Sequence, residues 1–176
     1  NGLNYMSPQA ALVRKPVLDL FDKKTDLRYT FCIGTSGKLP ATAESGSGMF
    51  NNMFFRWNCA GIKLSEAYLT VAECYARKGD KDNAVKYVND LRKNRHIRKY
   101  YTDLAAADAT EAMKIVREER KRELLFTSNG FFDMRRFCTE FNETLTREFE
   151  DKTYTLTPAS HLLTFPFPVV AMQNSH

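Results

Sequence analysis

Apolar residues recur at helical spacing through the middle of the chain and predict two helices joined by a short polar turn. The apolar positions are Tyr68, Val71, Ala72, Tyr75, Ala84, Val88 and Leu91. The turn covers residues 78–82, where Gly79 is suited to ending the first helix and Asp82 to starting the second. A tetratricopeptide unit fills these positions with packing residues over its ~34-residue repeat, although a plain helical hairpin explains the spacing almost as well.

A second helical stretch places charges where its apolar stripe should continue. Ala112 and Val116 share one helix face, and the same spacing next reaches Glu119 or Arg120 and then Glu123. One interpretation is a solvated helix held by surface ion pairs, each worth about 0.2–0.5 kcal/mol. In the other, Glu119, Arg120 and Glu123 turn inward as paired ions that fix how neighbouring segments dock, which requires a partner for every charge.

The first sixty residues carry little periodicity. Residues 28–60 contain Gly34, Gly37, Pro40, Gly46 and Gly48, and long structureless loops are uncommon in self-sufficient domains. We therefore expect residues 1–62 to be an amino-terminal segment and long loop that packs on a helical region, residues 63–176. A single hairpin cannot bury both of its faces, so we expect the chain to be the carboxy-terminal part of a protein whose amino-terminal half carries further helices and binds it.

Short motifs follow one another in a recognisable order. They are Leu18, Phe21, Asp26 and Arg28; then Lys63, Ser65, Glu66, Tyr68, Leu69, Ala72 and Glu73; then Glu119, Arg120, Glu123, Leu124, Phe132, Asp133, Arg135 and Arg136; and last Leu163, Pro166, Pro168 and Asn174. Their order and spacing resemble the carboxy-terminal pattern of the SusD/RagB family of outer-membrane nutrient-binding lipoproteins. One difference is visible, because Thr127 and Gly130 stand where that family usually has Glu and Arg.

The resemblance implies a mainly α fold, with a tetratricopeptide-like hairpin, further helices and long irregular loops. It implies a protein that is lipid-anchored on the extracellular face of the outer membrane and binds a glycan or other nutrient. Oligosaccharide or polysaccharide would pass unaltered to a TonB-dependent transporter of the SusC type, and no cofactor is expected. Among these motif residues we expect structural ion pairs to be formed by Glu119, Arg120, Glu123, Asp133 and Arg135. Two alternatives stay open: a tetratricopeptide adaptor for a protein or peptide, and a family member retained mainly for pairing with the transporter.

Net charge and catalytic motifs narrow the functional classes. The net charge of +5 invites a nucleic-acid interpretation, but the basic run from Lys86 to Lys99 is typical of a solvated connector. No helix-turn-helix, zinc-finger or RNA-binding motif accompanies this run, so we expect no nucleic-acid partner. The glutamates of the charged stretch alternate with arginines, which would lower the pKa of a carboxyl group that a glycosidase needs protonated. We therefore expect a binding protein and not an enzyme.

Aromatic residues in the connecting region suggest a sugar site. Trp57 is the sole tryptophan, and it stands beside Phe55, Arg56 and Asn58. Aromatic faces offer large contact areas to the apolar faces of sugar rings, while Arg and Asn side chains can hydrogen-bond hydroxyl groups. We therefore predict glycan binding by Trp57, Arg56, Phe55 and Asn58. The alternative is that the aromatic side chains of this region anchor the loop to the helical core.

The four cysteines show neither a CxxC pair nor the spacing of zinc ligands, so no metal is expected. Cys74 is predicted to be a small core residue of the first hairpin helix. Cys32 and Cys59 bracket the loop, which leaves open a disulfide between them in an oxidising compartment.

Overall fold

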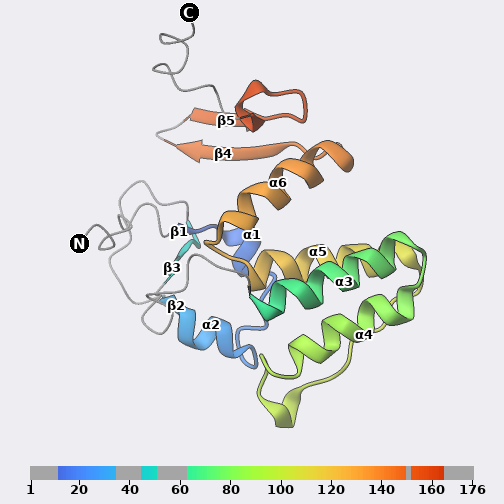
Figure 1. Cartoon of the computed structure of the whole chain (residues 1–176). Helices are drawn as coiled ribbons and strands as arrows, with labels where there is room; N and C mark the ends of the chain where they lie inside the picture. Colours follow the sequence, from blue (N-terminus) through green and yellow to red (C-terminus); the bar gives the residue numbers. More distant parts are fainter. Residues whose placement is uncertain (1–11, 35–44, 51–62, 150–151, 165–176) are drawn as a thin grey trace, which may run out of the picture. The chain divides into compact units, whose positions relative to one another are not determined.

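The computed structural model describes residues 12–34, 45–50, 63–149 and 152–164, and the predicted mainly α fold is confirmed (Figure 1). The helices are α1 (Lys15–Leu18), α2 (Leu27–Cys32), α3 (Leu64–Arg77), α4 (Lys81–Arg92), α5 (Ala109–Glu123) and α6 (Ser128–Glu140). The strands are β1 (Leu12–Val13), β2 (Ile33–Gly34), β3 (Gly48–Phe50), β4 (Leu145–Phe149) and β5 (Lys152–Leu156). Two short 3-10 helices cover Arg98–Tyr100 and His161–Leu163. No helix within the described ranges is long and apolar enough to span a membrane.

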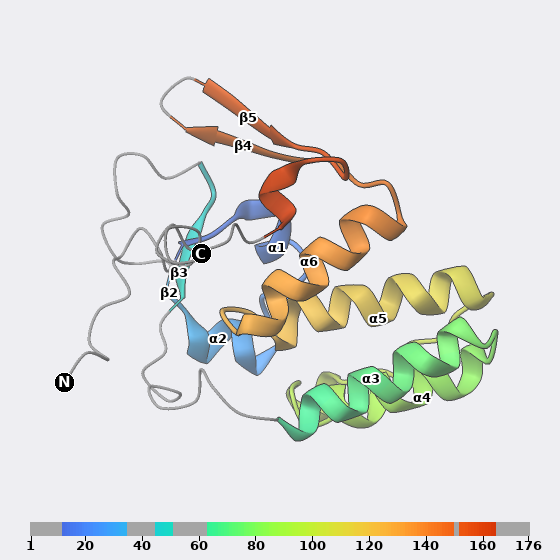
Figure 2. The ribbon, with the colours of Figure 1, turned by 45° about the horizontal axis from the view of Figure 1, so that its top comes forward.

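The chain divides into two compact units, Asn1–Gly130 and Phe131–His176. The first unit holds α1 to α5 and a three-stranded sheet of order β1-β3-β2. The second unit holds most of α6 and the antiparallel pair β4 and β5, which lie side by side in Figure 2. The predicted division between residues 62 and 63 stays a prediction. The ion network around Glu119 and the cavity described below belong to the first unit.

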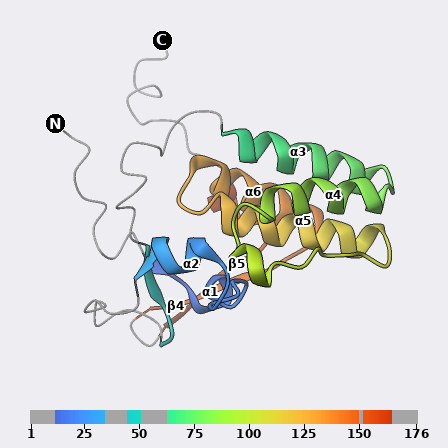
Figure 3. The ribbon, with the colours of Figure 1, turned by 90° about the horizontal axis from the view of Figure 1, so that it is seen from below.

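Three helices, α3, α4 and α5, form the centre of the first unit, and Figure 3 shows them packed together. Their apolar side chains form two adjoining clusters: Leu69, Ala72, Val88, Leu91 and Val116, and Ala76, Ala84, Val85, Ala112 and Met113. Ala72 and Ala84 are fully buried. Because neither side chain extends beyond Cβ, α3 and α4 can approach each other closely.

The turn between α3 and α4 confirms one predicted cap and corrects the other. Gly79 adopts a left-handed φ of +82°. The N–H groups of Gly79 and Asp80 each donate at 3.0 Å, to the carbonyls of Ala76 and Tyr75, which is the Schellman arrangement that ends a helix. The prediction that Asp82 starts the second helix is wrong. Asp80 caps α4, because its backbone is still non-helical and its carboxylate accepts from the N–H of Asn83 at 3.0 Å.

Part of the apolar surface of α3 faces away from this core. Val71 is 37% exposed and Cys74 is exposed, so the predictions that they are packing residues are wrong. Helical spacing carries both side chains around the helix from the buried face. Tyr68 and Tyr75 are half-buried and pack on Tyr87 of α4, with ring centroids 5.8 and 5.7 Å from it.

Short regular elements occur in residues 28–60 where the structure describes this range. α2, β2 and β3 lie within or across it, and β3 pairs with β1 and β2 through Leu12↔Met49 and Ile33↔Phe50. These short elements bury an apolar cluster of Val13, Leu18 and Ile33, against which Phe50, Leu125 and Phe126 pack. The periodicity is weak because each element is too short to repeat a pattern.

Candidate functional site

Glu119 of α5 lies at the centre of a buried network of ions. Its side chain is 0% exposed, and its oxygens accept from Arg28 Nη1 at 2.7 Å, Arg92 Nη1 at 3.1 Å and Arg122 Nη2 at 2.7 Å. Burial by itself would raise the pKa of Glu119, but Arg28, Arg122 and Arg92 lower that pKa to about 2. This carboxylate is therefore ionised at neutral pH and has no proton to give as a general acid.

Two further carboxylates complete the network through Arg28. Glu123 accepts from Arg28 Nη1 at 2.8 Å and from Arg95 Nη2 at 2.8 Å. Asp26 caps α2 by accepting from the backbone N–H of Arg28 at 2.9 Å, and it also accepts from Arg28 Nη2 at 2.8 Å. Burial lowers the pKa of Arg28, but Glu119, Asp26 and Glu123 raise it above its ordinary value. Arg28 is therefore a fixed cation that holds all three carboxylates.

The network joins three segments that are distant in the sequence. α2 contributes Arg28, the end of α4 and the turn after it contribute Arg92 and Arg95, and α5 contributes the glutamates. Backbone hydrogen bonds run beside these ions, from Leu27 N–H to the Arg95 carbonyl at 2.8 Å and from Ile97 N–H to the Thr25 carbonyl at 2.9 Å. Buried ion pairs add little net stability but penalise arrangements that leave a charge alone. The network therefore fixes how the amino-terminal elements dock on the helices.

The partners of the glutamates were not identified from the sequence. Arg92 and Arg95 fall in the basic run that was interpreted as a solvated connector, and the structure instead directs both to α5. No local signal could have found them, because each pair joins residues 27 or 28 positions apart in the sequence.

The other residues of the predicted ion set lie outside this network. Arg120 is buried, and its Nε lies 3.8 Å from Oε2 of Glu73. In the second unit, Asp133 accepts from Arg136 Nη2 at 2.8 Å. Arg135 is exposed, and its backbone carbonyl accepts from the hydroxyl of Thr139. The predicted set therefore spans both units of the chain and more than one cluster.

His96 borders the network on the side of α2. The imidazole is buried, with Nε2 at 3.6 Å from Oδ2 of Asp26 and Nδ1 at 3.2 Å from the hydroxyl of Thr25. Burial lowers the pKa of His96, and the nearby Arg92 lowers it further, although Asp26 opposes the shift. The ring is therefore neutral at neutral pH and leaves the charge balance of the network unchanged.

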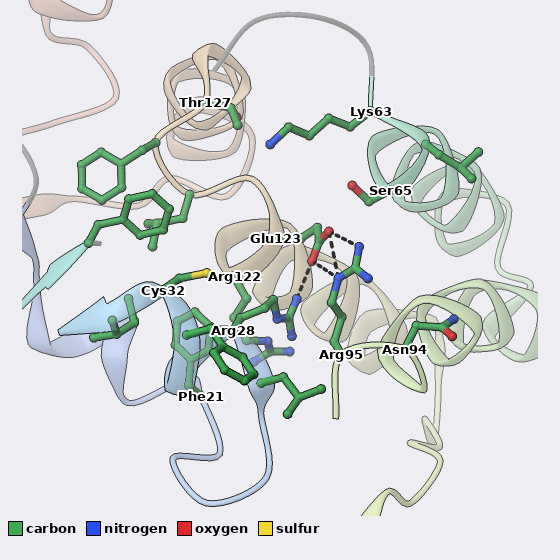
Figure 4. A pocket seen from close by; sticks show the side chains of 17 residues that line it. Phe21, Arg28, Cys32, Lys63, Ser65, Asn94, Arg95, Arg122, Glu123 and Thr127 are labelled. Atoms are coloured by element: carbon green, nitrogen blue, oxygen red, sulfur yellow. Dashed lines mark hydrogen bonds and ion pairs between the residues drawn. The ribbon is translucent and has the colours of Figure 1, made fainter. Parts of the chain in front are cut away.

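A cavity of about 600 Å³ lies beside the ions (Figure 4). Its apolar lining consists of Phe21, Leu27, Phe31, Cys32, Ile33, Phe50, Leu64, Leu125 and Phe126. Its polar lining consists of Arg28, Lys63, Ser65, Asn94, Arg95, Arg122, Glu123 and Thr127. This volume falls within the range of roughly 300–1,000 Å³ that ligand pockets occupy, and an apolar wall with a few convergent polar groups is typical of them.

Phe126 in the apolar wall has a left-handed backbone, with φ of +56°. Such a conformation is a genuine outlier for a bulky residue, and the Phe126 ring packs on Phe50 with the centroids 4.8 Å apart. The neighbouring Thr127 donates from its hydroxyl to the carbonyl of Leu124 at 2.7 Å, which holds the turn. Strained residues of this kind cluster at ligand sites, which supports the cavity as the candidate site.

The residues predicted to contact glycan, Trp57, Arg56, Phe55 and Asn58, lie outside the described residues, and so does Cys59. Cys32 is buried and carries a free thiol, and burial raises the pKa of that thiol. It therefore lacks the reactivity of a thiolate. Within the described ranges, no group of three or more His, Cys, Asp or Glu residues is arranged to hold a metal ion.

Comparison with protein families identifies the class. The SusD family matches residues 56–161, which is more than half of the chain and includes the hairpin of α3 and α4 and all of α5. The chain therefore belongs to the SusD family, and the predicted membership is confirmed. A search of curated proteins found no match. Members of this family are binding proteins of the outer-membrane surface that capture nutrients, glycans among them, together with SusC-type transporters.

Proposed function

We propose that this protein binds a glycan or other nutrient at the bacterial cell surface and delivers it, chemically unaltered, to a TonB-dependent outer-membrane transporter of the SusC type. In the intact protein a lipid anchor would hold it on the extracellular face of the outer membrane. The observation that carries the proposal is the match of residues 56–161 to the SusD family.

The chemistry of the buried glutamates supports binding and not catalysis. A glycosidase needs a pair of carboxyl groups, one of which is kept protonated by a raised pKa. Glu119 has a pKa lowered to about 2 and is held by three arginines. Glu123 is held by Arg28 and Arg95. Both carboxylates are therefore committed to holding segments together.

The cavity supports a ligand site in the first unit. The segment with Trp57, Arg56, Phe55 and Asn58 runs in the sequence from Phe50 to Lys63, and these two residues both line the cavity. The two described residues that flank this segment in the sequence therefore both lie at the cavity wall. For this reason the four residues remain part of the proposed glycan site.

Affinity gel electrophoresis of the intact chain against a panel of soluble polysaccharides tests this function. We expect at least one polysaccharide to retard the protein, and mass spectrometry of the recovered ligand to show an unchanged chain length. A folded protein that is retarded by no polysaccharide would contradict glycan binding. Shortened products would contradict the absence of catalysis.

The outer surface of α3 favours a second candidate, an adaptor for a protein or peptide. Leu64 is 74% exposed and Val71 is 37% exposed, and with Tyr68 and Tyr75 they form one stripe at helical spacing. Exposed apolar patches mark interaction surfaces. Val71→Asp should abolish binding of a protein partner and leave glycan binding intact if this stripe is an interface.

A further inference from the structure

Positive charge exceeds negative charge at the cavity. Among the described residues its lining carries four cations, Arg28, Lys63, Arg95 and Arg122, and one carboxylate, Glu123. Behind the lining, Asp26 binds Arg28, and Glu119 binds both Arg28 and Arg122. Three carboxylates thus face four cations, and one positive charge is left over. Arg92 adds another cation on the far side of Glu119.

Lys63 is the cation that is left to meet a ligand. It forms no ion pair with any residue in the described part of the chain, and its side chain is half-buried. Figure 4 shows this side chain pointing across the cavity from the start of α3. The positive end of the dipole of α3 lies at the same place, because the 14-residue helix begins at Leu64 and Lys63 provides no side-chain cap.

A second donor is already held in place at the cavity. Arg95 uses Nε and Nη2 to bind Glu123, at 3.0 and 2.8 Å. This pairing orients the guanidinium plane and leaves Nη1 for a further acceptor. A donor fixed before binding loses little entropy when a ligand arrives.

Aromatic side chains also line the cavity. Phe31 is 53% exposed although it lines the cavity, and Phe50 and Phe126, which line it too, pack with their ring centroids 4.8 Å apart. Rings of this kind present flat apolar faces on which the apolar face of a sugar ring can stack. The lining of the cavity therefore combines aromatic surface with cationic donors. A uronic acid matches both, since it has an apolar ring face and a carboxylate at its edge.

We infer that the cavity selects a carboxylate-bearing sugar, so that the captured nutrient is an acidic oligosaccharide containing uronic acid. Lys63 and Arg95 bind the carboxylate, and the Phe31 side of the cavity receives the ring. This inference rests on the proposed function, because it names the class of glycan that the protein captures.

Calorimetric titration of the intact chain with two matched trisaccharides tests it. α-1,4-Linked trigalacturonate and α-1,4-linked galactotriose differ only at C6 of each ring, which is a carboxylate in the first sugar and a hydroxymethyl group in the second. We expect trigalacturonate to bind at least about tenfold more tightly, because hydrogen bonds to an ionised group are stronger than neutral ones. The preference should shrink at high salt, since Lys63 is partly exposed to solvent.

Substitutions at the cavity locate the effect. Lys63→Met removes the charge while keeping the apolar stem, so it should abolish the preference for trigalacturonate, and Lys63→Arg should retain it. Lys114→Met, at an exposed position of α5, is the matched control and should change nothing. Phe31→Ala should weaken the binding of both trisaccharides to a similar extent, because stacking on the Phe31 ring does not depend on the charge of the sugar.

The outcomes separate this inference from the function beneath it. Equal affinity for the two trisaccharides, or an unchanged preference in a folded Lys63→Met variant, overturns the selection of acidic sugars and leaves glycan binding standing. Failure of both trisaccharides while another polysaccharide retards the protein also overturns it. Failure of every glycan tested contradicts the proposed function itself.

Discussion

The two halves of α5 bury opposite kinds of side chain along one stripe of the same helix. In the first half Ala112 and Val116 are fully buried against α3 and α4. In the second half Glu119 is equally buried, but against three arginines. Apolar burial is non-directional and favours any close packing, whereas a buried charge needs its own partner in place. The first half therefore holds the helices together, and the second decides which segments dock there.

The difference extends to the ligand site. Arg122 and Glu123 of the charged half line the cavity, together with the chain that follows α5, whereas Ala112, Met113 and Val116 of the apolar half do not. Substitutions in the charged half should therefore affect ligand binding as well as stability. Substitutions in the apolar half should affect stability alone. Variants of α5 can test this separation directly.

The largest expected effect is that of Glu119→Ala. Removing this carboxylate leaves Arg28, Arg92 and Arg122 short of a partner in a buried site, which should cost about 3–5 kcal/mol of unfolding free energy. The matched control is Glu118→Ala, the next residue along the helix, where the loss should be about 0–1 kcal/mol. Urea denaturation followed by circular dichroism measures both. Similar midpoints for the two variants would show that the charged half is an ordinary helix surface.

Acid should weaken the charged half in two pH windows. The pKa of Glu119 is lowered from 4.5 to about 2 in the folded state, so its contribution is complete above pH 4.5 and is lost as the pH falls towards 2. The loss should be roughly 3 kcal/mol from the size of the shift. The pKa of His96 is also lowered, from 6.5, so folding keeps this ring neutral and loses stability as the pH falls below 6.5. Urea midpoints measured across the acid range should therefore begin to fall below pH 6.5 and fall further below pH 4.5.

His96→Asn separates the two windows. The variant has no imidazole to protonate, so the upper part of the decline should flatten while the part below pH 4.5 remains. A decline between pH 6.5 and 4.5 that is as steep in the variant as in the wild type would assign the loss to other groups.

A smaller effect is expected for Val116→Ala in the apolar half. Two buried methyl groups are removed, and at about 0.8 kcal/mol for each buried carbon, plus the cost of the space left behind, the loss should be about 2 kcal/mol. No proton is linked to this burial, so the loss should be the same at pH 7 and pH 5. Affinity for the trisaccharides should not change. A pH-dependent loss would mean that the two halves of α5 are coupled.

The sequence predicts the hairpin of α3 and α4 well because its signals are local. Helical spacing and Gly79 act within a few residues of the structure they determine. The pairs that hold the charged half are of another kind, since Glu119 meets Arg28 across 91 residues. No spacing within one element encodes such a pair. Glu119 and Glu123 could be recognised as candidates for inward-facing ions, but Arg92 and Arg95 could not be recognised as their partners.

Helical spacing also could not predict two further features, which are the exposed face of α3 and the cavity. α3 carries apolar residues on two neighbouring faces, and the pattern does not say which face α4 and α5 cover. Val71 and Cys74 were assigned to the covered face and are exposed. The cavity was beyond prediction for a different reason, because its walls come from α2, β3, the start of α3, the turn after α4 and the end of α5. It exists only once those segments have docked.

The smallest expected effect concerns the turn that sets how α3 and α4 meet in the apolar half. Gly79→Ala should cost about 1 kcal/mol, because a residue with Cβ is strained at a φ of +82°. A new Cβ there would meet nothing within 4 Å, so strain in the backbone is the whole effect. Gly130→Ala is the opposite case, because this glycine lies in α6 without a positive φ and its new Cβ would come no closer than 3.5 Å to the Leu124 carbonyl. That substitution should be neutral or stabilise by up to about 1 kcal/mol, since alanine favours helices. The melting temperature of Gly79→Ala should therefore fall, while that of Gly130→Ala should stay unchanged or rise. A Gly79→Ala protein as stable as the wild type would show that the apolar half does not depend on this turn.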